Sequence, residues 1–385
     1  MRILCLTSSY PRHTADIAGR FVLEHCQTLA THGHEIDVLC WNSPEFRVPD
    51  DRIHPVRYAP RRLERLFYGA GVPENIARRP WLLALAPGAL AAMIAEVLQR
   101  SRVPGTRRPD LLIGHWLFPA GIIARICGRI LGIPSLVIGH SGGVHLLDNL
   151  PTPAARALAG LVTDGPTTVP TEELRIKFGR HTDTSHVRVL PMGFQSSPAA
   201  AAQLDDRQDW LCMGRLVPIK GIDLAIEAFS RAKLPPTTRL HIAGDGPERE
   251  RYESMAGPNI IFHGFVTGPQ KEAILKRCGF FLLTSKTLDS GRHEGLPVSL
   301  LEASHHALIP LTTDIPGIAP HLAHPARQNF PDRDVDRWAA RITSFAAMPE
   351  TERQGLSEAT RRQVAPLTWK NHGPHWHEFV LECVV

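Results

Sequence analysis

The sequence predicts an α/β fold built from two doubly wound, Rossmann-like domains that face each other across a cleft. Its 385 residues exceed what one hydrophobic core normally serves. Short apolar or β-branched runs alternate with longer helical patterns, as in a parallel sheet covered by helices. This alternation stops at a stretch rich in Ser, Ala and Pro and then begins again, which favours two such units in tandem.

The first half shows the alternation from its first residues. The expected strands are "RILCLTS", "EIDVLCW", "DLLIGHW", "PSLVIGH" and "TTVPT", with helices over about 19–32 and 120–131. Ligands of open parallel sheets bind beyond the carboxyl ends of the strands. Residues that directly follow a strand are therefore the candidates for a site.

The second half repeats the pattern after a predicted linker, Phe194 to Gln208. Its expected strands are "DWLCMGR", "RLHIAGDG", "NIIFHGF" and "FFLLTS", with helices over 222–232, near 270–277 and beyond Pro297. We expect one domain over 1–193 and a second domain over 194–367. A C-terminal helix over about 368–385 is expected to pack back on the first domain.

The composition is that of a globular protein, with 43% hydrophobic and 21% charged residues. The most apolar stretch, "WLLALAPGALAAMIA" from Trp81, falls short of the roughly 20 residues of a spanning helix and is interrupted by Pro87 and Gly88. It predicts a buried or interfacial helix. Seven scattered cysteines without a C-x-x-C pair favour reduced thiols in the cytoplasm. The first residues are too weakly apolar for a signal peptide and favour a strand.

The net charge of +5 is unevenly distributed, since residues 1–200 carry 22 basic and 16 acidic side chains. Six arginines flank the apolar stretch: Arg57, Arg61, Arg62, Arg65, Arg78 and Arg79. Such a combination suits an anionic membrane surface, which would make the protein peripheral on the inner face of the plasma membrane. A solvated basic face explains it equally well. No nucleic-acid-binding motif accompanies the arginines, so no nucleic-acid partner is expected.

Two cations follow the first strand of the second half, in "GRLVPIKG". Arg215 and Lys220 lie at a strand end next to a helix start, where charge and free N–H groups both favour an anion such as a diphosphate. A surface turn with two solvated charges is the alternative.

Two carboxylates stand eight positions apart in "RHEGLPVSLLEA". Eight helical residues rise about 12 Å, too far for Glu294 and Glu302 to act as the paired acids of a glycosidase. With Pro297 near a helix start, the amides around Gly295 and Leu296 lie at the helix N-terminus, where they favour the same anion. The two acids would then hold opposite ends of one long ligand.

Together, "GRLVPIKG" and the E-x7-E spacing of "EGLPVSLLEA" resemble the donor-binding half of glycosyltransferase family 4, retaining enzymes of the GT-B architecture. "AGDGPE", "IIFHGFVTGPQKEAILKRC", "THGHEIDVLC" and "VLPMGF" extend the resemblance over most of the chain. "HWLFPAG" and "YGAGVPENI" are similar to a bacterial subgroup that acts in surface-polysaccharide or glycolipid assembly.

The resemblance implies a role for each matching residue. Arg215 and Lys220 would bind the donor diphosphate, Glu294 the transferred sugar and Glu302 the ribose. Phe265 and Val266 would meet the base through their backbones, and Gly19 would let the first N-terminal loop approach the phosphates. His140 matches the family histidine beside the donor sugar. The residues to which the resemblance assigns a catalytic or donor-binding role are Gly19, His140, Arg215, Lys220, Phe265, Val266, Glu294, Gly295, Leu296 and Glu302.

Two departures from the family pattern stand out. Gly143 occupies the position of the aspartate in the family's His-Gly-x-Asp sequence, and Gly19 stands alone where many relatives have a glycine pair. No metal or other cofactor is expected, because the acids of "PDRDVDRW" suit a first helical turn and the histidines form no H-E-x-x-H motif.

The predicted function is retaining transfer of a hexose-type sugar from a nucleotide sugar, with UDP favoured, to a lipid-linked or polysaccharide acceptor in cell-surface glycan biosynthesis. A nucleotide-sugar epimerase on the same architecture and a non-catalytic nucleotide-sugar-binding protein are the alternatives. An epimerase needs no acceptor, and a non-catalytic protein would not hydrolyse the donor.

Overall fold

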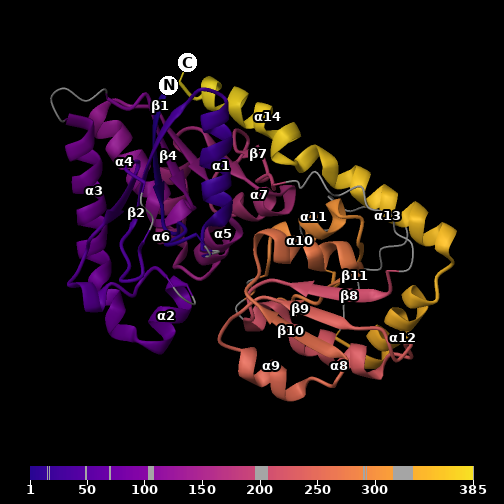
Figure 1. The fold of residues 1–385 in the computed structure, drawn as a ribbon. Coiled ribbons are helices and arrows are strands. Elements are labelled where there is room, and N and C mark those ends of the chain that lie inside the picture. The colour runs from indigo at the N-terminus through magenta and orange to yellow at the C-terminus, as the bar shows by residue number, and fades with distance from the viewer. Residues whose placement is uncertain are drawn as a thin grey trace. The chain divides into compact units, whose positions relative to one another are not determined.

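The computed structural model describes residues 1–14, 16, 18–47, 50–68, 71–102, 108–195, 207–288, 291, 293–314 and 333–384. The chain divides into two compact units, Met1–Gly193 with His372–Val385, and Phe194–Asn371. Each unit is a parallel sheet with helices packed on it (Figure 1). The predicted fold class of two Rossmann-like domains is thereby confirmed.

The first unit contains a seven-stranded sheet of order β3-β2-β1-β4-β5-β6-β7. Its strands are β1 (Arg2–Thr7), β2 (Glu35–Trp41), β3 (Ile53–Val56), β4 (Leu111–His115), β5 (Ser135–Ile138), β6 (Thr167–Val169) and β7 (Arg188–Val189). Its helices are α1 (Arg20–Thr31), α2 (Val72–Arg78), α3 (Ala86–Arg102), α4 (Ile122–Leu131), α5 (Ser141–Asp148), α6 (Thr152–Thr163), α7 (Glu172–Phe178) and most of α14 (Trp369–Glu382). The strand order reverses between β1 and β4, so the loops that follow these strands form the favoured binding edge.

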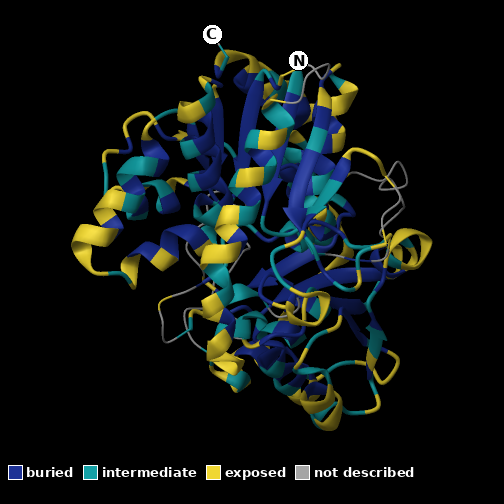
Figure 2. Ribbon diagram, turned by 90° about the vertical axis from the view of Figure 1, so that its left-hand side faces the viewer, coloured by how far each residue is buried: buried dark blue, intermediate teal, exposed yellow. Residues whose placement is uncertain are grey.

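The strands of this sheet are apolar at consecutive positions because both faces are covered. Leu4 and Leu6 of β1 belong to a core built with Met93 of α3 and Ile123 of α4. Cys5 points to the other face, against α1. A strand buried on both faces shows a continuous apolar run rather than an alternating one. Figure 2 shows the strands as buried and the outward helix surfaces as exposed.

The second unit contains a five-stranded sheet of order β10-β9-β8-β11-β12. Its strands are β8 (Asp209–Met213), β9 (Leu240–Ala243), β10 (Ile260–Gly264), β11 (Cys278–Leu283) and β12 (Ile309–Thr312). Its helices are α8 (Ile222–Arg231), α9 (Arg249–Met255), α10 (Gly268–Arg277), α11 (Val298–His305), α12 (Val335–Ala346) and α13 (Glu350–Val364). Here the order reverses between β8 and β11.

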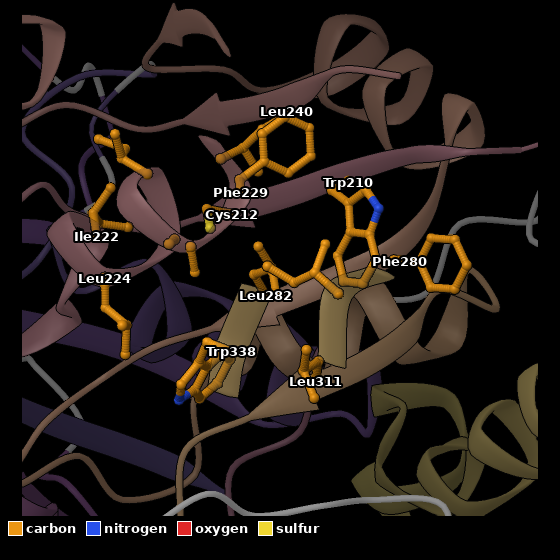
Figure 3. Close-up of a cluster of buried hydrophobic side chains, with 14 of the residues drawn as sticks. Trp210, Cys212, Ile222, Leu224, Phe229, Leu240, Phe280, Leu282, Leu311 and Trp338 are labelled. Atoms are coloured by element: carbon orange, nitrogen blue, oxygen red, sulfur yellow. The ribbon is translucent and has the colours of Figure 1, made fainter. Parts of the chain in front are cut away.

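The core of the second unit also lies on both faces of its sheet. Figure 3 shows one face, where Trp210 of β8 stacks on Phe280 of β11 with ring centroids 4.4 Å apart and Trp338 of α12 closes the cluster. The next residue of β11, Phe281, belongs to the opposite cluster with Leu300 of α11. Fully buried aromatic side chains of this size contribute a large share of the hydrophobic stabilisation.

Two expectations about chain breaks are wrong. Pro87 and Gly88 do not interrupt the apolar stretch, because Pro87 is the second residue of α3, where a missing N–H costs little. The 3-10 helix Pro80–Leu85 continues directly into α3. Together they form one helical segment, Pro80–Arg102, which is long and apolar enough to cross a membrane by length and composition alone. Only 22% of its apolar window is buried.

The expected linker starts too early. Phe194 is fully buried in the second unit, where it pairs with Thr368 in an isolated bridge and its carbonyl accepts from the amide of Trp369 at 2.9 Å. Residues 196–206 of the linker lie outside the described residues.

The C-terminal part of α14 packs on the first unit through specific contacts. Trp376 Nε1 donates to the carbonyl of Pro191 at 3.0 Å, and His372 Nε2 lies 2.9 Å from the same oxygen. Arg188 forms an ion pair with Glu382 at 2.7 Å. The helix therefore supports β7 and the residues that follow it.

Candidate functional site

The carboxyl ends of β8 and β11 bring two predicted site residues into direct contact. Lys220 Nζ, in the loop after β8, lies 2.6 Å from Glu294 Oε1, in the loop after β11. Ser285 Oγ donates to the other oxygen of Glu294, also at 2.6 Å. The Lys220 and Glu294 side chains are only 15% and 14% exposed, so the pair lies partly shielded from water at the switch point of the sheet.

A glycine turn makes this approach possible. Gly221 precedes α8 with φ 60°, and a Cβ there would lie 2.1 Å from the carbonyl oxygen of Thr284. Only glycine fits such a contact with a left-handed backbone. The loops after the two neighbouring strands can therefore touch, which places Lys220 beside Ser285.

The other predicted donor residues lie on loops and a helix of the same unit. Arg215 is exposed on the turn after β8, and Gly295 and Leu296 are half-buried just before α11. Glu302 lies on α11, where Lys271 Nζ of α10 contacts its Oε1 at 2.6 Å.

The segment predicted to meet the base lies after β10. Phe265 is half-buried, whereas the Val266 side chain is buried in the core of the second unit. Val266 would therefore offer a ligand its backbone groups rather than its side chain.

The first unit presents its own predicted residues at the carboxyl edge of β1, β4 and β5. Gly19 is the N-cap of α1 with φ 66°, and a Cβ there would lie 2.1 Å from the carbonyl oxygen of Ser9. This close turn starts α1 so that Phe21 packs edge-on against His140, with ring centroids 4.9 Å apart. Gly19 and His140, distant in sequence, therefore belong to one neighbourhood.

His140 is held in an aromatic environment. Its ring centroid is 4.9 Å from that of Trp116 and 5.6 Å from that of His115, to which its ring is nearly parallel with an interplanar angle of 11°. Burial lowers the pKa of His140 to about 3, because an imidazolium ion would lose its hydration there. At neutral pH His140 is a neutral hydrogen-bonding group and not a cation.

Sequence reasoning missed three side chains that contact predicted site residues: Ser285, Lys271 and His115. His115 lies in "HWLFPAG", a segment matched to the family, and it ends β4 beside the switch point. That position was an available signal. Ser285 ends the predicted strand "FFLLTS", and Lys271 lies in "IIFHGFVTGPQKEAILKRC", which is also matched to the family. Their partners carry no local signal, since only the strand order and helix packing bring them to Glu294 and Glu302.

The departure at Gly143 has a steric reason. A Cβ at this position in α5 would lie 2.9 Å from Cβ of Leu117, which is fully buried. An aspartate does not fit here unless Leu117 moves. The space that the family pattern gives to a polar side chain is taken by an apolar one in this chain.

The acids of "PDRDVDRW" behave as expected where the structure describes them. The Asp334 carboxylate caps α12 and accepts from the amides of Asp336 and Arg337. Across the described part of the chain, no three His, Cys, Asp or Glu side chains are placed to hold a metal ion. Asp332 lies outside the described residues.

Two family models match the chain and together span most of it. Residues 18–193 match the glycosyl transferase 4-like domain, and residues 195–363 match glycosyl transferases group 1. The boundary between the two matches falls at the boundary between the two structural units.

Curated relatives are similar in sequence at a modest level. A Bacillus subtilis protein, TuaC, named as a candidate teichuronic acid biosynthesis glycosyltransferase, is 25% identical over 83% of this chain and 82% of its own length. A Salmonella typhimurium protein, WcaL, named for colanic acid biosynthesis, is 28% identical over 41% of this chain. That match spans only 40% of WcaL. A GDP-mannose-dependent phosphatidylinositol monomannoside mannosyltransferase of Mycobacterium tuberculosis is 26% identical over 60% of this chain and 64% of its own length.

Solved structures show the same fold. Anabaena HepE, solved with UDP-glucose, superposes with a TM-score of 0.71 at 13% identity, over 99% of this chain and 100% of HepE. The lipopolysaccharide outer core galactosyltransferase WaaB gives 0.63 at 13% identity, over 99% of both chains.

Proposed function

This chain belongs to the group 1 glycosyltransferases and has their GT-B fold, and from that premise we propose that it transfers a hexose from a nucleotide sugar with retention of configuration. The acceptor is a lipid-linked or polysaccharide molecule of cell-surface glycan biosynthesis. The contact of Lys220 with Glu294 carries the proposal. An epimerase and a non-catalytic binding protein are set aside, because the family assigns a transferase.

The site suits a nucleotide sugar because it places a positively charged side chain next to a carboxylate that can accept hydrogen bonds. Lys220 supplies positive charge where a diphosphate leaves, and Glu294 supplies a carboxylate for sugar hydroxyls. Without a ligand the two neutralise each other, which limits the cost of holding a charge partly out of water. When the donor binds, the Lys220 ammonium group leaves Glu294 and contacts the phosphate, while Ser285 keeps the Glu294 carboxylate in place. Preorganised groups of this kind stabilise the charge that develops on the leaving diphosphate.

The chemistry proposed for the transfer follows from what these residues can do. The acceptor hydroxyl attacks the anomeric carbon on the face that the diphosphate leaves, and its proton passes to the departing phosphate. Lys220 and Arg215 stabilise that phosphate, and the amides of Gly295 and Leu296 add the positive end of α11. Glu302 holds the ribose at the far end of the donor.

UDP is the favoured nucleotide, supported by the HepE complex with UDP-glucose. The mycobacterial relative is named as GDP-mannose-dependent, so a guanine nucleotide is the competing choice.

A thermal-shift panel of UDP-glucose, UDP-galactose, UDP-N-acetylglucosamine and GDP-mannose tests the donor. A ligand that binds the folded protein at 100 times its Kd stabilises it by about 2.7 kcal/mol. We expect one UDP-sugar to raise Tm equally with and without EDTA, and the same sugar to be slowly hydrolysed. The GDP sugar alone raising Tm would overturn the nucleotide assignment, and no shift with any sugar would overturn the proposed function.

A surface of the first unit supports the proposed attachment to the inner face of the plasma membrane. Helix α3 buries Ala89, Met93 and Val97 against the sheet, while large apolar side chains near its start face outward. These exposed side chains, the apolar surface, are Trp81 (49%), Leu83 (57%) and Leu90 (38%). The exposed arginines that precede it in sequence are Arg57, Arg61, Arg62, Arg65, Arg78 and Arg79. Exposed apolar side chains close in sequence to arginines suit the headgroup region of an anionic bilayer, where a membrane-held acceptor would be found.

Flotation with vesicles tests this surface. The double variant Trp81→Ser, Leu83→Ser should bind vesicles of anionic phospholipid about 10-fold more weakly than the unaltered protein. The double variant Arg78→Gln, Arg79→Gln should lose about 30-fold, since each basic residue near such a surface contributes about 1 kcal/mol.

A matched control uses exposed isoleucines elsewhere in the same unit. Ile130 and Ile176 are 56% and 61% exposed on α4 and α7. Ile130→Ser with Ile176→Ser should leave vesicle binding unchanged. Equal losses in this control and in the Trp81, Leu83 variant would show that the apolar surface is not the attachment site.

A further inference from the structure

Three histidine side chains form a continuous hydrogen-bonded row in the first unit. Nδ1 of His25, on α1, lies 3.1 Å from Nε2 of His115, at the end of β4. Nδ1 of His115 lies 3.3 Å from Nε2 of His140, which follows β5. The family resemblance implied a role for His140 alone, so the two histidines behind it need an explanation of their own.

The row runs from the interior to the edge of the sheet. His25 and His115 are 1% and 0% exposed, and His140 is half-buried at the outer end. Trp376 of α14 packs edge-on against His25, with ring centroids 4.6 Å apart. Burial lowers the pKa of His25 to about 3 and that of His115 well below its usual value. All three imidazoles are therefore neutral at physiological pH.

In such a row of neutral imidazoles, the tautomer of each ring determines the tautomer of its neighbours. Each ring carries one N–H and one lone pair, so a ring that donates on one side accepts on the other. If His140 donates from Nε2, then His115 must also donate from Nε2 and His25 keeps its proton on Nε2. In the opposite direction all three protons are on Nδ1. The geometry thus permits two states, and in each state the three histidines share one tautomer.

From this we infer that His115 and His25 are positioning residues for sugar transfer: they fix the ring orientation and tautomer of His140. The inference rests on the proposed function, because it takes His140 to face the donor sugar. Nε2 of His140 is engaged by His115, which leaves Nδ1 for the substrate. Because the three rings share one tautomer, the position of the proton on His25 determines whether Nδ1 of His140 donates or accepts a hydrogen bond. Partners that orient metal-bound histidines are typically worth about 10- to 100-fold in activity, and we expect an effect of similar size for His140.

The row is an unusual way to fill a core, which supports a role beyond packing. Three polar rings in the interior require every hydrogen bond between them to be made, whereas apolar side chains of similar size would carry no such demand. The aromatic rings of Phe21 and Trp116 also enclose His140, so water is a poor substitute for His115 as its partner.

Nitrogen-15 NMR of the imidazoles tests the row directly and without any substrate. We expect the unaltered protein to show the same tautomer for His25, His115 and His140. In His115→Phe, which keeps a somewhat larger aromatic ring but removes both hydrogen bonds, His140 should change to a mixture of tautomers. Different tautomers among the three histidines of the unaltered protein would overturn the inference.

Kinetics with the donor found in the thermal-shift panel supply the second readout. His115→Phe should lower kcat about 10- to 100-fold with the KM for the donor within about 2-fold. His115→Asn, which can still present one polar atom toward His140, should recover part of the lost kcat. His25→Phe removes the hydrogen bond at the buried end of the row and should also lower kcat. This variant replaces His115→Phe in the test if His115→Phe does not fold.

A matched control breaks another histidine pair of the same unit. His34 Nε2 lies 2.8 Å from His377 Nδ1, and His34 is 5% exposed next to the amino end of β2. His34→Phe should leave kcat and the His140 tautomer unchanged. If unaltered protein transfers sugar but His115→Phe keeps full kcat, the inference fails and the proposed function stands. If unaltered protein transfers nothing from any donor, the proposed function fails, and the NMR result still decides whether the row is coupled.

Discussion

Replacing Glu294 with glutamine is expected to lower kcat for sugar transfer by about 1,000-fold while leaving the fold intact. Removing one preorganised hydrogen-bonding group from an enzyme's charge-stabilising site costs about 100- to 1,000-fold in kcat. Here the change also deprives Lys220 of its charge partner and Ser285 Oγ of a carboxylate acceptor. Glu294→Ala, which removes the carboxylate that Ser285 and Lys220 contact, should abolish sugar transfer. Steady-state kinetics and the Tm of each variant measure the two effects.

An exposed glutamate of the same unit provides the control. Glu253, on α9, is paired with Arg249 at the surface, and Glu253→Gln should change neither kcat nor Tm measurably. Turnover of Glu294→Gln equal to that of the unaltered enzyme would refute the assignment of the E-x7-E pair.

Replacing Arg125 with methionine is expected to destabilise the first unit by about 3–5 kcal/mol, because each buried acceptor left without a donor costs about 1–3 kcal/mol. Arg125 is 3% exposed, and its guanidinium donates to the carbonyls of Val162, Ser135 and Pro166 and to two hydroxyls. Burial lowers its pKa to about 10, so it remains protonated at neutral pH. Methionine fills part of the volume but leaves the buried carbonyls without donors. Urea unfolding measures the loss.

The next arginine of the same helix is the control for Arg125. Arg129 lies one turn further along α4, is about half exposed and pairs with Asp164. Arg129→Met should change the free energy of unfolding by no more than about 1 kcal/mol. If the two variants lose equal stability, the buried guanidinium does not hold these strands and helices together.

The two arginines show where sequence reasoning stops. "IIARICGRI" contains both within one amphipathic helix, and nothing local distinguishes them. Arg125 faces inward because Ser135 of β5 and Pro166, just before β6, present carbonyls to that side of α4, which depends on the order of strands far apart in sequence. The Pro87 error has the opposite cause. Proline locally predicts a break, but at the second residue of α3 it has no helical hydrogen bond to lose.

The parallel sheets, the two-unit plan and the family can be predicted from local patterns in the amino-acid sequence: continuous apolar strands, helix periodicity and the motifs around Gly221 and Glu294. Which distant side chains meet depends on how the chain folds: Ser285 with Glu294, Lys271 with Glu302, and His25 with His115 and His140. The physical reason is that backbone propensity and burial act over a few residues, whereas these contacts depend on strand order and helix packing. A hydrogen bond between groups distant in the chain leaves no periodic mark in either segment.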